Sequence, residues 1–232
     1  MINVFLLTQD EPFFVPKVIR HILSAQGKEF NVIGATCLKP HRKNKSMKDW
    51  FDERVQIYRP YELLLVGAIY VYCKFFYPIF SLFSGKHFYS VKDSLKEFEV
   101  KTIDTNDVND TEYIKNLQKL DIDVVLSVSP PQLFKEGLVG VPKKCSLNAH
   151  GTLLPRHRGV FGSWWTLYSG DNEGGATIHT MELKLDAGEN VYQESFPLES
   201  GDTQYSIAFK TKGLLAKGSV AVLKKLVFSC IN

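Results

Sequence analysis

Apolar runs of strand length recur along the first two thirds of the chain, separated by stretches with helical spacing. The runs cover residues 4–7, 30–37, 123–128 and 146–148. Each run is short and nearly continuous in apolar residues, as expected for strands that are buried on both faces. Strands separated by helical crossovers predict an α/β fold, with a doubly wound, mostly parallel sheet and helices on both of its faces. In such sheets, a binding site lies beyond the carboxyl ends of the strands.

Apolar residues at helical spacing predict three longer helices. They are expected at about residues 12–27, 111–120 and 203–228. Gly27 is expected to stop the first helix, and Asp110 can cap the second. Thr203, together with the preceding aspartate, is expected to cap the third, which is expected to break near Gly213 or Gly218.

After residue 160 the pattern changes to a short helix and two strands that flank a polar loop. The helix is expected over 162–168, and the strands over 176–181 and 191–196. The length favours one domain covering 1–232, with a C-terminal helical segment at about 202–228.

Two segments do not fit a minimal fold of this kind. Residues 39–48 carry five Lys or Arg side chains and no acidic one. A solvated loop is the favoured interpretation of this segment, and contact with the diphosphate of a nucleotide sugar is the alternative. Residues 61–83, within a helical insert at about 50–85, are apolar at most positions.

The apolar segment is long enough to span a bilayer, but Lys74 and Pro78 interrupt it. The surrounding α/β pattern also leaves no topology for a single span. A buried helix is therefore favoured, one that packs on the core, lines the acceptor pocket or forms a dimer interface. Attachment to a membrane surface stays open, and so does a homodimer.

Composition excludes several classes of protein. Apolar residues make up 44% of the chain and charged residues 23%, as in ordinary soluble domains. The net charge of +3 is too small to indicate a nucleic-acid-binding protein. The N-terminus lacks the features of a signal peptide. The cysteines show no metal-ligand spacing and read as reduced thiols of a cytoplasmic protein; they are Cys37, Cys73, Cys145 and Cys230.

Candidate chemistry lies at the end of the fourth expected strand. Asn148 and His150 are two residues apart, so in extended backbone their side chains point the same way, into one cleft. Asp186 lies between the last two strands, where Asp-Ala-Gly is usually only a turn with a positive φ at Gly188. Spacing alone does not bring Asp186 to His150.

The segment 148–159 reads Asn-Ala-His-Gly-Thr-Leu-Leu-Pro-Arg-His-Arg-Gly, and 185–188 reads Leu-Asp-Ala-Gly. Together they resemble the signature of the N10-formyltetrahydrofolate-dependent N-formyltransferases, which act on methionyl-tRNA, glycinamide ribonucleotide or amino sugars. The resemblance is specific over about 121–194, looser over 1–37 and 88–120, and absent over 50–85. It implies the Rossmann-like formyltransferase fold, and catalytic roles for Asn148, His150 and Asp186.

The resemblance also implies a mechanism without a metal. Asn148 and a protonated His150 would stabilise the oxyanion that forms when a neutral amine attacks the formyl carbon. Asp186 would raise the pKa of His150 and accept the proton that the amine loses.

The resemblance implies further that two loops hold the folate. Their residues are Gln132, Leu133 and Phe134 after the third strand, and Met181, Glu182, Leu183 and Leu185 before the Asp186 turn. For Leu133, Phe134 and Leu185, simple core packing is an equal alternative. For His179, a supporting role is favoured over chemistry.

Differences between this sequence and the family pattern narrow the choice of the amine that would accept the formyl group. Methionyl-tRNA enzymes carry a further C-terminal domain, which is not expected here. Glycinamide ribonucleotide enzymes hold a phosphate on a glycine-rich first loop, whereas this loop carries Asp10 and Glu11, which would repel a phosphate. An amino sugar, free or nucleotide-linked, is therefore the expected substrate. Asp10, Glu11, Arg156 and Arg158 are its candidate contacts, with helix-start charges or structural pairing as the alternatives.

Two other functions remain open at this point. Formyltetrahydrofolate deformylase shares the catalytic residues but transfers the formyl group to water; it has a regulatory domain before the core, whereas the first expected strand begins here at about Ile2. A non-catalytic folate-binding module is the other alternative, and the presence of all three of Asn148, His150 and Asp186 argues against it.

Overall fold

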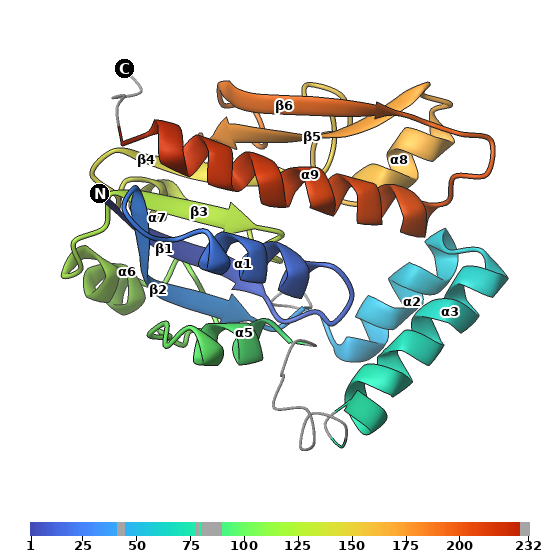
Figure 1. Cartoon of the computed structure of the whole chain (residues 1–232), viewed down its shortest axis with the longest axis horizontal. Coiled ribbons are helices and arrows are strands. Elements are labelled where there is room, and N and C mark those ends of the chain that lie inside the picture. The colour runs from blue at the N-terminus through green and yellow to red at the C-terminus, as the bar shows by residue number, and fades with distance from the viewer. Residues whose placement is uncertain (41–44, 78, 80–89, 228–232) are drawn as a thin grey trace.

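The computed structural model describes residues 1–40, 45–77, 79 and 90–227. Its strands form a six-stranded sheet in the order β2-β1-β3-β4-β5-β6. The strands are β1 (Ile2–Gln9), β2 (Phe30–Leu38), β3 (Val124–Val128), β4 (Cys145–His150), β5 (Glu173–Thr180) and β6 (Asn190–Pro197). The first four run parallel, whereas β5 pairs antiparallel with both β4 and β6. The predicted doubly wound, mostly parallel sheet is confirmed (Figure 1).

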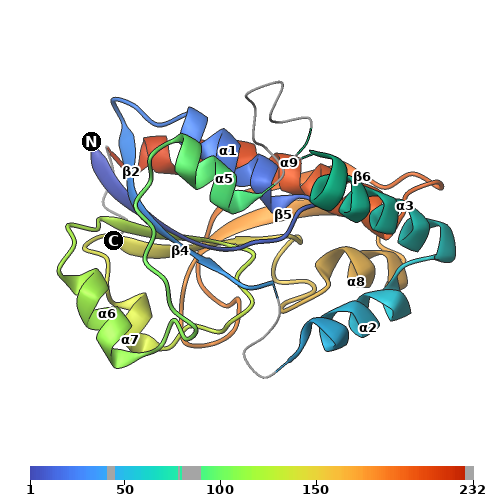
Figure 2. The ribbon, with the colours of Figure 1, turned by 90° about the horizontal axis from the view of Figure 1, so that it is seen from below.

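Helices cover both faces of the sheet (Figure 2). One face carries α1 (Val15–Ser24), α5 (Val91–Glu97) and α9 (Gln204–Lys225), and the other carries α6 (Thr111–Gln118) and α7 (Glu136–Val139). Two clusters of buried apolar side chains, one on each face, form the core. The short helix expected over 162–168 is α8 (Gly162–Tyr168).

Helix ends follow their capping groups. Asp110 accepts a hydrogen bond from the backbone N–H of Tyr113 and caps α6 as predicted. Helix α1 begins at Val15 and ends at Ser24, so both boundaries expected for it are about three residues off. Its start is set by Glu11, whose carboxylate accepts bonds from the next free backbone amides, those of Phe13, Phe14 and Val15.

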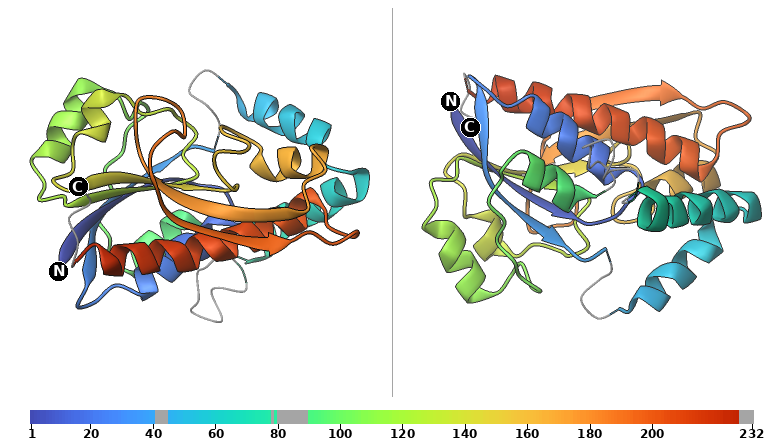
Figure 3. Two further views of the ribbon diagram at one scale, coloured as in Figure 1. Left: turned by 90° about the horizontal axis from the view of Figure 1, so that it is seen from above. Right: turned by 60° about the horizontal axis from the view of Figure 1, so that its bottom comes forward.

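The last helix is capped by Thr203 as predicted, but the expected break is absent from it. Helix α9 continues through both glycines to Lys225. Gly218 serves packing, since a Cβ there would lie 2.3 Å from the Tyr192 ring on β6. Figure 3 shows α9 running along β5 and β6, which this close approach allows. Residues 228–232 lie outside the described part.

The segment between β2 and α5 forms helices that leave most of their apolar side chains in solvent. They are α2 (Met47–Ile57), α3 (Pro60–Val71) and the π-helical turn η1 (Tyr72–Phe76). Leu64, at 77% exposure, is the extreme case, and Glu62 is the buried residue of α3. The expectation of a helix buried against the core is therefore wrong for the described residues; 78 and 80–83 lie outside them. Across the described ranges, no helix is long and apolar enough to cross a membrane.

The basic segment is described only in part, since residues 41–44 lie outside the described ranges. Of its described members, Lys45 forms an ion pair with Glu53 of α2. Lys39 and Lys48 are exposed. The contact with a diphosphate stays a prediction.

The turn after β5 depends on a close approach of two backbone segments. A Cβ on Gly188 would lie 1.7 Å from the carbonyl oxygen of Thr180, which no side chain tolerates. The positive φ expected at Gly188 is instead found at Asp186, at 45°. Gly188 is thus required for space, and the adjacent aspartate takes the left-handed conformation that Asp tolerates better than most residues.

We expect Gly188→Ala to lower the free energy of unfolding by about 3 kcal/mol or more, because the clash can be relieved only by moving backbone. Chemical denaturation of the purified protein measures the change. Gly201→Ala is the control, since nothing lies within 4 Å of a Cβ at that exposed turn. Equal stabilities of the two variants would contradict the packing argument.

Candidate active site

Strand β4 carries two polar side chains at its carboxyl end. Asn148 and His150 occupy alternate positions, so they project to the same side, as predicted. On the antiparallel neighbour β5, His179 is the register partner of Asn148. The Asn148 Nδ2 donates to the His179 Nε2 at 3.2 Å. The antiparallel pairing of β4 and β5 therefore adds a second imidazole to the site.

Asp186 lies against these residues and is enclosed by donors. Its Oδ2 accepts a hydrogen bond from the Gly159 N–H at 2.7 Å and lies 3.5 Å from the His150 Nδ1. Its Oδ1 accepts from the Asn148 Nδ2 at 3.4 Å and lies 3.5 Å from the His179 Nε2. The three residues singled out in the sequence are thus brought together, and His179 and Gly159 join them.

Both ring nitrogens of His150 face oxygen atoms. The Nε2 lies 3.1 Å from the carbonyl oxygen of His157, and the Nδ1 faces Asp186. Burial nevertheless lowers the pKa of His150, and this effect outweighs the charge of Asp186 and the His157 carbonyl, which both act to raise it. Asp186 thus acts to raise the pKa of His150, as expected, but burial outweighs it, so the protonated His150 of the expected mechanism is disfavoured in the folded protein.

The carboxylate of Asp186 stays ionised in the same surroundings. Burial acts to raise its pKa, but the contacts with the His179 and His150 imidazoles and the hydrogen bond from the Gly159 amide together hold the pKa below its ordinary value. A neutral imidazole beside a fixed carboxylate is an arrangement that can accept a proton.

Lys212 of α9 also reaches this region, and nothing in the sequence pattern indicated it. Its Nζ is hydrogen-bonded to the Oγ of Ser129, which follows β3 in a left-handed conformation. Burial lowers the pKa of Lys212, whereas the charge of Glu11 acts to raise it. The charge of Lys212 is among the influences that lower the pKa of His150. The sequence does not reveal this contact, because it depends on how α9 packs against the sheet near the end of β3.

The two acidic residues of the first loop are engaged with helix starts. Glu11 is buried and caps α1 as described above. The Asp10 Oδ1 accepts a bond from the Val91 N–H at the start of α5, and burial raises the pKa of Asp10. Both carboxylates therefore occupy positions at which an anion would otherwise bind.

The residues predicted to hold the folate fall into two groups. Leu133, Leu183 and Leu185 are exposed, so the core alternative is wrong for Leu133 and Leu185. Glu182 is also exposed. A cavity of about 490 Å³ adjoins the second loop, lined by Glu136, Val139, Gly140, Glu182, Leu183 and Lys184.

The remaining members of this set contact the protein itself. Phe134 packs against the core cluster that contains Leu138. Gln132 accepts from the Val108 N–H and donates to the Asn106 carbonyl, and thereby fixes the neighbouring loop. The Met181 N–H donates to the Ser146 carbonyl.

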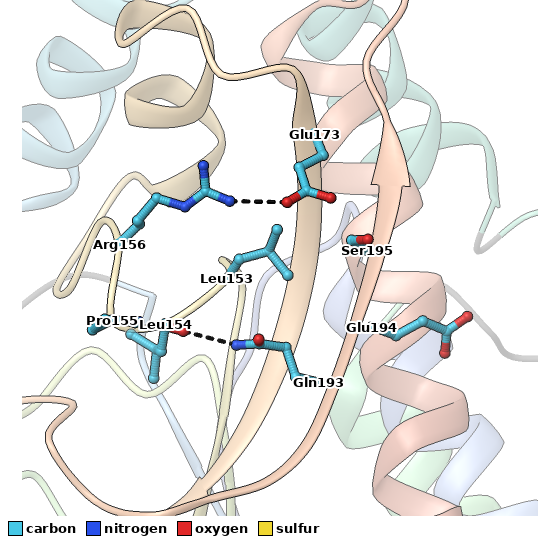
Figure 4. Close-up of a pocket in the computed structure, with 8 residues that line it drawn as sticks. All are labelled: Leu153, Leu154, Pro155, Arg156, Glu173, Gln193, Glu194 and Ser195. Atoms are coloured by element: carbon cyan, nitrogen blue, oxygen red, sulfur yellow. Dashed lines mark hydrogen bonds and ion pairs between the residues drawn. The ribbon is translucent and has the colours of Figure 1, made fainter.

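The two candidate arginines differ in their contacts. Arg156 forms ion pairs with Glu173 at 3.1 Å and Asp171 at 3.7 Å. It lines a cavity of about 220 Å³ with residues 153–155 of its own loop, Glu173 of β5 and residues 193–195 of β6 (Figure 4). Asn148, His150 and Asp186 are not among the residues that line it. Arg158 is exposed. Pairing therefore occupies Arg156, and the sugar contact stays a prediction for both.

One buried acceptor at the centre of the site has no donor. Among the described residues, the Oδ1 of Asn148 is buried without a hydrogen-bond partner. Such orphaned atoms are rare in proteins and mark places where a ligand or water binds. Within the described ranges, no group of three or more His, Cys, Asp or Glu side chains is placed to hold a metal ion.

Residues 86–223 match the family model described as "Formyl transferase", and this range is more than half of the 232 residues. The chain belongs to the formyl transferase family. Asn148, His150, Asp186 and Lys212 all lie within the matched range.

Two relatives with different names match this chain to a similar degree. The bifunctional polymyxin resistance protein ArnA of Wigglesworthia glossinidia brevipalpis is 32% identical over 138 residues, which are 60% of this chain and 20% of ArnA. The methionyl-tRNA formyltransferase of Nostoc sp. is 31% identical over 117 residues, 50% of this chain and 34% of that enzyme. The matched region thus spans only a fifth to a third of these relatives.

Solved structures share the fold over nearly the whole chain. A phosphoribosylglycinamide formyltransferase from Anaplasma phagocytophilum aligns with a TM-score of 0.68 at 16% identity, over 97% of this chain and 87% of that one. A sugar N-formyltransferase from Shewanella sp. aligns with a TM-score of 0.62 at 16% identity, over 98% and 70%. The formyl transferase fold is common to both, so the fold alone does not select the acceptor.

We expect the free energy of unfolding to decrease as the pH falls below about 6.5, the ordinary pKa of histidine. The lowered pKa of folded His150 means that the unfolded chain binds the proton more readily there. Asp186, whose folded pKa is depressed, adds a loss in the same direction at lower pH. Urea denaturation over a pH series measures both.

His150→Gln should flatten the dependence just below pH 6.5, since it removes the buried titrating group. The exposed His21 on α1 supplies the control His21→Gln, which should retain the wild-type dependence. A His150→Gln protein with an unchanged pH dependence would contradict the effect of burial on this ring.

Proposed function

We propose that this chain transfers a formyl group from N10-formyltetrahydrofolate to the amine of an amino sugar. The observation that carries the proposal is the cluster of Asn148, His150 and Asp186, in which the amide and the imidazole each lie within 3.5 Å of the carboxylate. Membership of the formyl transferase family supports the reaction type. The products would be an N-formyl sugar and tetrahydrofolate.

Each side chain of the trio fits one need of amine acylation. The Asn148 amide would donate to the oxyanion through Nδ2, in place of its 3.4 Å bond to Asp186. Its Oδ1, which has no partner among the described residues, would accept from the attacking amine. Asp186 would take the proton of the amine directly or through a water. His150 can receive that proton, because both its nitrogens face oxygens that would stabilise the imidazolium.

The donor would lie between the two loops predicted from the family resemblance. The exposed Leu133, Leu183 and Leu185 provide apolar surface for a flat ring, and the adjacent cavity supports this placement. The formyl group supplied by the bound folate would then face the end of β4, where Asn148 and His150 project. Phe134 and Gln132 would shape the first loop from behind.

The contacts of the first loop support a sugar as acceptor. Glu11 occupies the amides at the start of α1, so a phosphate would meet a carboxylate there instead of free N–H groups. This argues against a glycinamide ribonucleotide, although such enzymes share the fold. Methionyl-tRNA remains the competing acceptor. The methionyl-tRNA formyltransferase of Nostoc sp. is 31% identical to this chain over the matched region, and ArnA is 32% identical.

The test is release of tetrahydrofolate from N10-formyltetrahydrofolate, measured with amino sugars, nucleotide-linked amino sugars, glycinamide ribonucleotide and methionyl-tRNA. Release only with a sugar amine is expected. Release without any acceptor would indicate a deformylase, and absence of release with every acceptor would indicate a binding module.

Asp186→Asn should lower kcat by roughly two orders of magnitude or more, because the proton acceptor of the site is lost. Steady-state kinetics with the acceptor found above provide the measurement, and thermal unfolding verifies the fold. Asp121→Asn makes the same change at an exposed residue that pairs with Lys143 and should leave kcat unaltered. Near-normal turnover by Asp186→Asn would remove the role assigned to it.

A further inference from the structure

The loop that follows β4 supplies two backbone groups to the candidate site. The carbonyl oxygen of His157 lies 3.1 Å from the His150 Nε2, and the Gly159 N–H donates to the Asp186 Oδ2 at 2.7 Å. Both groups belong to the short stretch between the end of β4 and the start of α8. The position of this stretch therefore determines what surrounds the imidazole and the carboxylate.

The His157 carbonyl determines which nitrogen of the unprotonated His150 ring carries the hydrogen. A carbonyl oxygen only accepts hydrogen bonds, so the contact at 3.1 Å requires the proton on Nε2. The competing acceptor is the Asp186 Oδ2. It lies 3.5 Å from the His150 Nδ1, which is beyond the ordinary length of an N–H···O bond. The bare Nδ1 therefore faces the carboxylate.

A bare Nδ1 is what the proposed reaction needs at this position. Asp186 would take the proton of the attacking amine, and the adjacent Nδ1 of His150 would receive it from the carboxylate. With the other tautomer, Nδ1 would already carry a hydrogen and could not receive that proton. The bare Nε2 would then face the His157 carbonyl, where no proton arrives. The tautomer of this ring thus decides whether it can work as a base.

The side chain of His157 holds the carbonyl of the same residue in place. Its Nε2 lies 2.7 Å from the Asp171 Oδ2, and each of the two side chains is only 14% exposed. His157 has a φ of 53°, a left-handed conformation that a residue other than glycine keeps only where its surroundings fix it. The Thr152 Oγ1 donates to the carbonyls of Arg156 and His157, at 3.0 and 3.4 Å, and orients the same stretch from the inside.

We propose that Asp171 and His157 are positioning residues, which hold the His157 carbonyl against His150 and thereby keep the hydrogen of the ring on Nε2. Neither side chain would touch a substrate. The effect on catalysis rests on the proposed function, whereas the tautomer itself can be measured in the free protein. A pair that only stabilises the loop would leave the tautomer unchanged, so the two roles are separable.

The first measurement is a long-range proton–nitrogen NMR spectrum of the ¹⁵N-labelled protein, which distinguishes a ring nitrogen that carries hydrogen from a bare one. It is recorded at about pH 8, well above the ordinary pKa of histidine. The His150 signals are those that disappear in His150→Gln. The wild type should carry the hydrogen on Nε2. His157→Ala and Asp171→Ala should each move it largely to Nδ1, because the charge of Asp186 is then the stronger acceptor.

The second measurement is steady-state kinetics with the acceptor identified above. His157→Ala should lower kcat roughly tenfold or more, with the KM of both substrates within about twofold of the wild type, because the side chain acts on the base and not on a substrate. His157→Gln places an amide N–H near the position of the lost Nε2 and can still donate to Asp171. It should restore the Nε2 tautomer and most of kcat.

Glu173→Ala is the matched control. Figure 4 shows Arg156 reaching across to Glu173, and the same arginine also pairs with Asp171 at 3.7 Å. This variant therefore removes a neighbouring carboxylate of the same loop while the Asp171 pair with His157 is kept. Its tautomer and kcat should equal those of the wild type.

A wild-type His150 with its hydrogen on Nδ1 would overturn the proposal. So would an unchanged tautomer in Asp171→Ala, which leaves every loop residue from 152 to 159 in place and serves as the test if His157→Ala does not fold. The expected tautomers in a protein that releases no tetrahydrofolate with any acceptor would contradict the proposed function and still support the positioning.

Discussion

The burial of the Asp186 carboxylate is the constraint on which the site depends. A charge removed from water must be surrounded by donors, or it is neutralised. Here the polar groups come from separate segments: the Gly159 amide from the loop after β4 and Asn148 from β4 donate hydrogen bonds, and the imidazoles of His150 from β4 and His179 from β5 lie 3.5 Å away. They converge only because β5 lies antiparallel beside β4 and because Gly188 lets the following turn approach Thr180. The strand order and Gly188 thus allow the ionised carboxylate of Asp186 to be buried at this position.

The protonation of the cluster follows from competing effects. Burial and the nearby Lys212 lower the pKa of His150, and Asp186 acts against them. Both ring nitrogens nevertheless point at oxygens, so the surroundings are arranged for an imidazolium that burial disfavours at rest. Such a site is better suited to receive a proton during a reaction than to hold one beforehand. A substrate that brings a proton and excludes water would change this balance without any movement of the backbone.

The sequence predicted what local periodicity controls. The strands, the cap at Asp110 and the common direction of Asn148 and His150 follow from spacing alone. Asp186 was linked to them only through a family resemblance, because no local pattern shows that β5 pairs beside β4. Lys212 was missed for the same reason, since its environment is created by the packing of α9 near Ser129. The prediction at Gly218 was wrong for another reason. Gly218 was expected to break α9, but it makes room for the Tyr192 ring.

The wrong expectation for α3 has a more general cause. Apolar composition predicts that a segment is covered, but it does not say by what. Among the described residues, neither core cluster contains a side chain of α2, α3 or η1, so the domain core is complete without them. Their apolar side chains therefore add little to the stability of the fold, while their exposure favours aggregation. Glu62 is buried to fix this helix against α9 although the core does not need it. The apolar side chains of α3 are therefore not accounted for by the packing of the domain core.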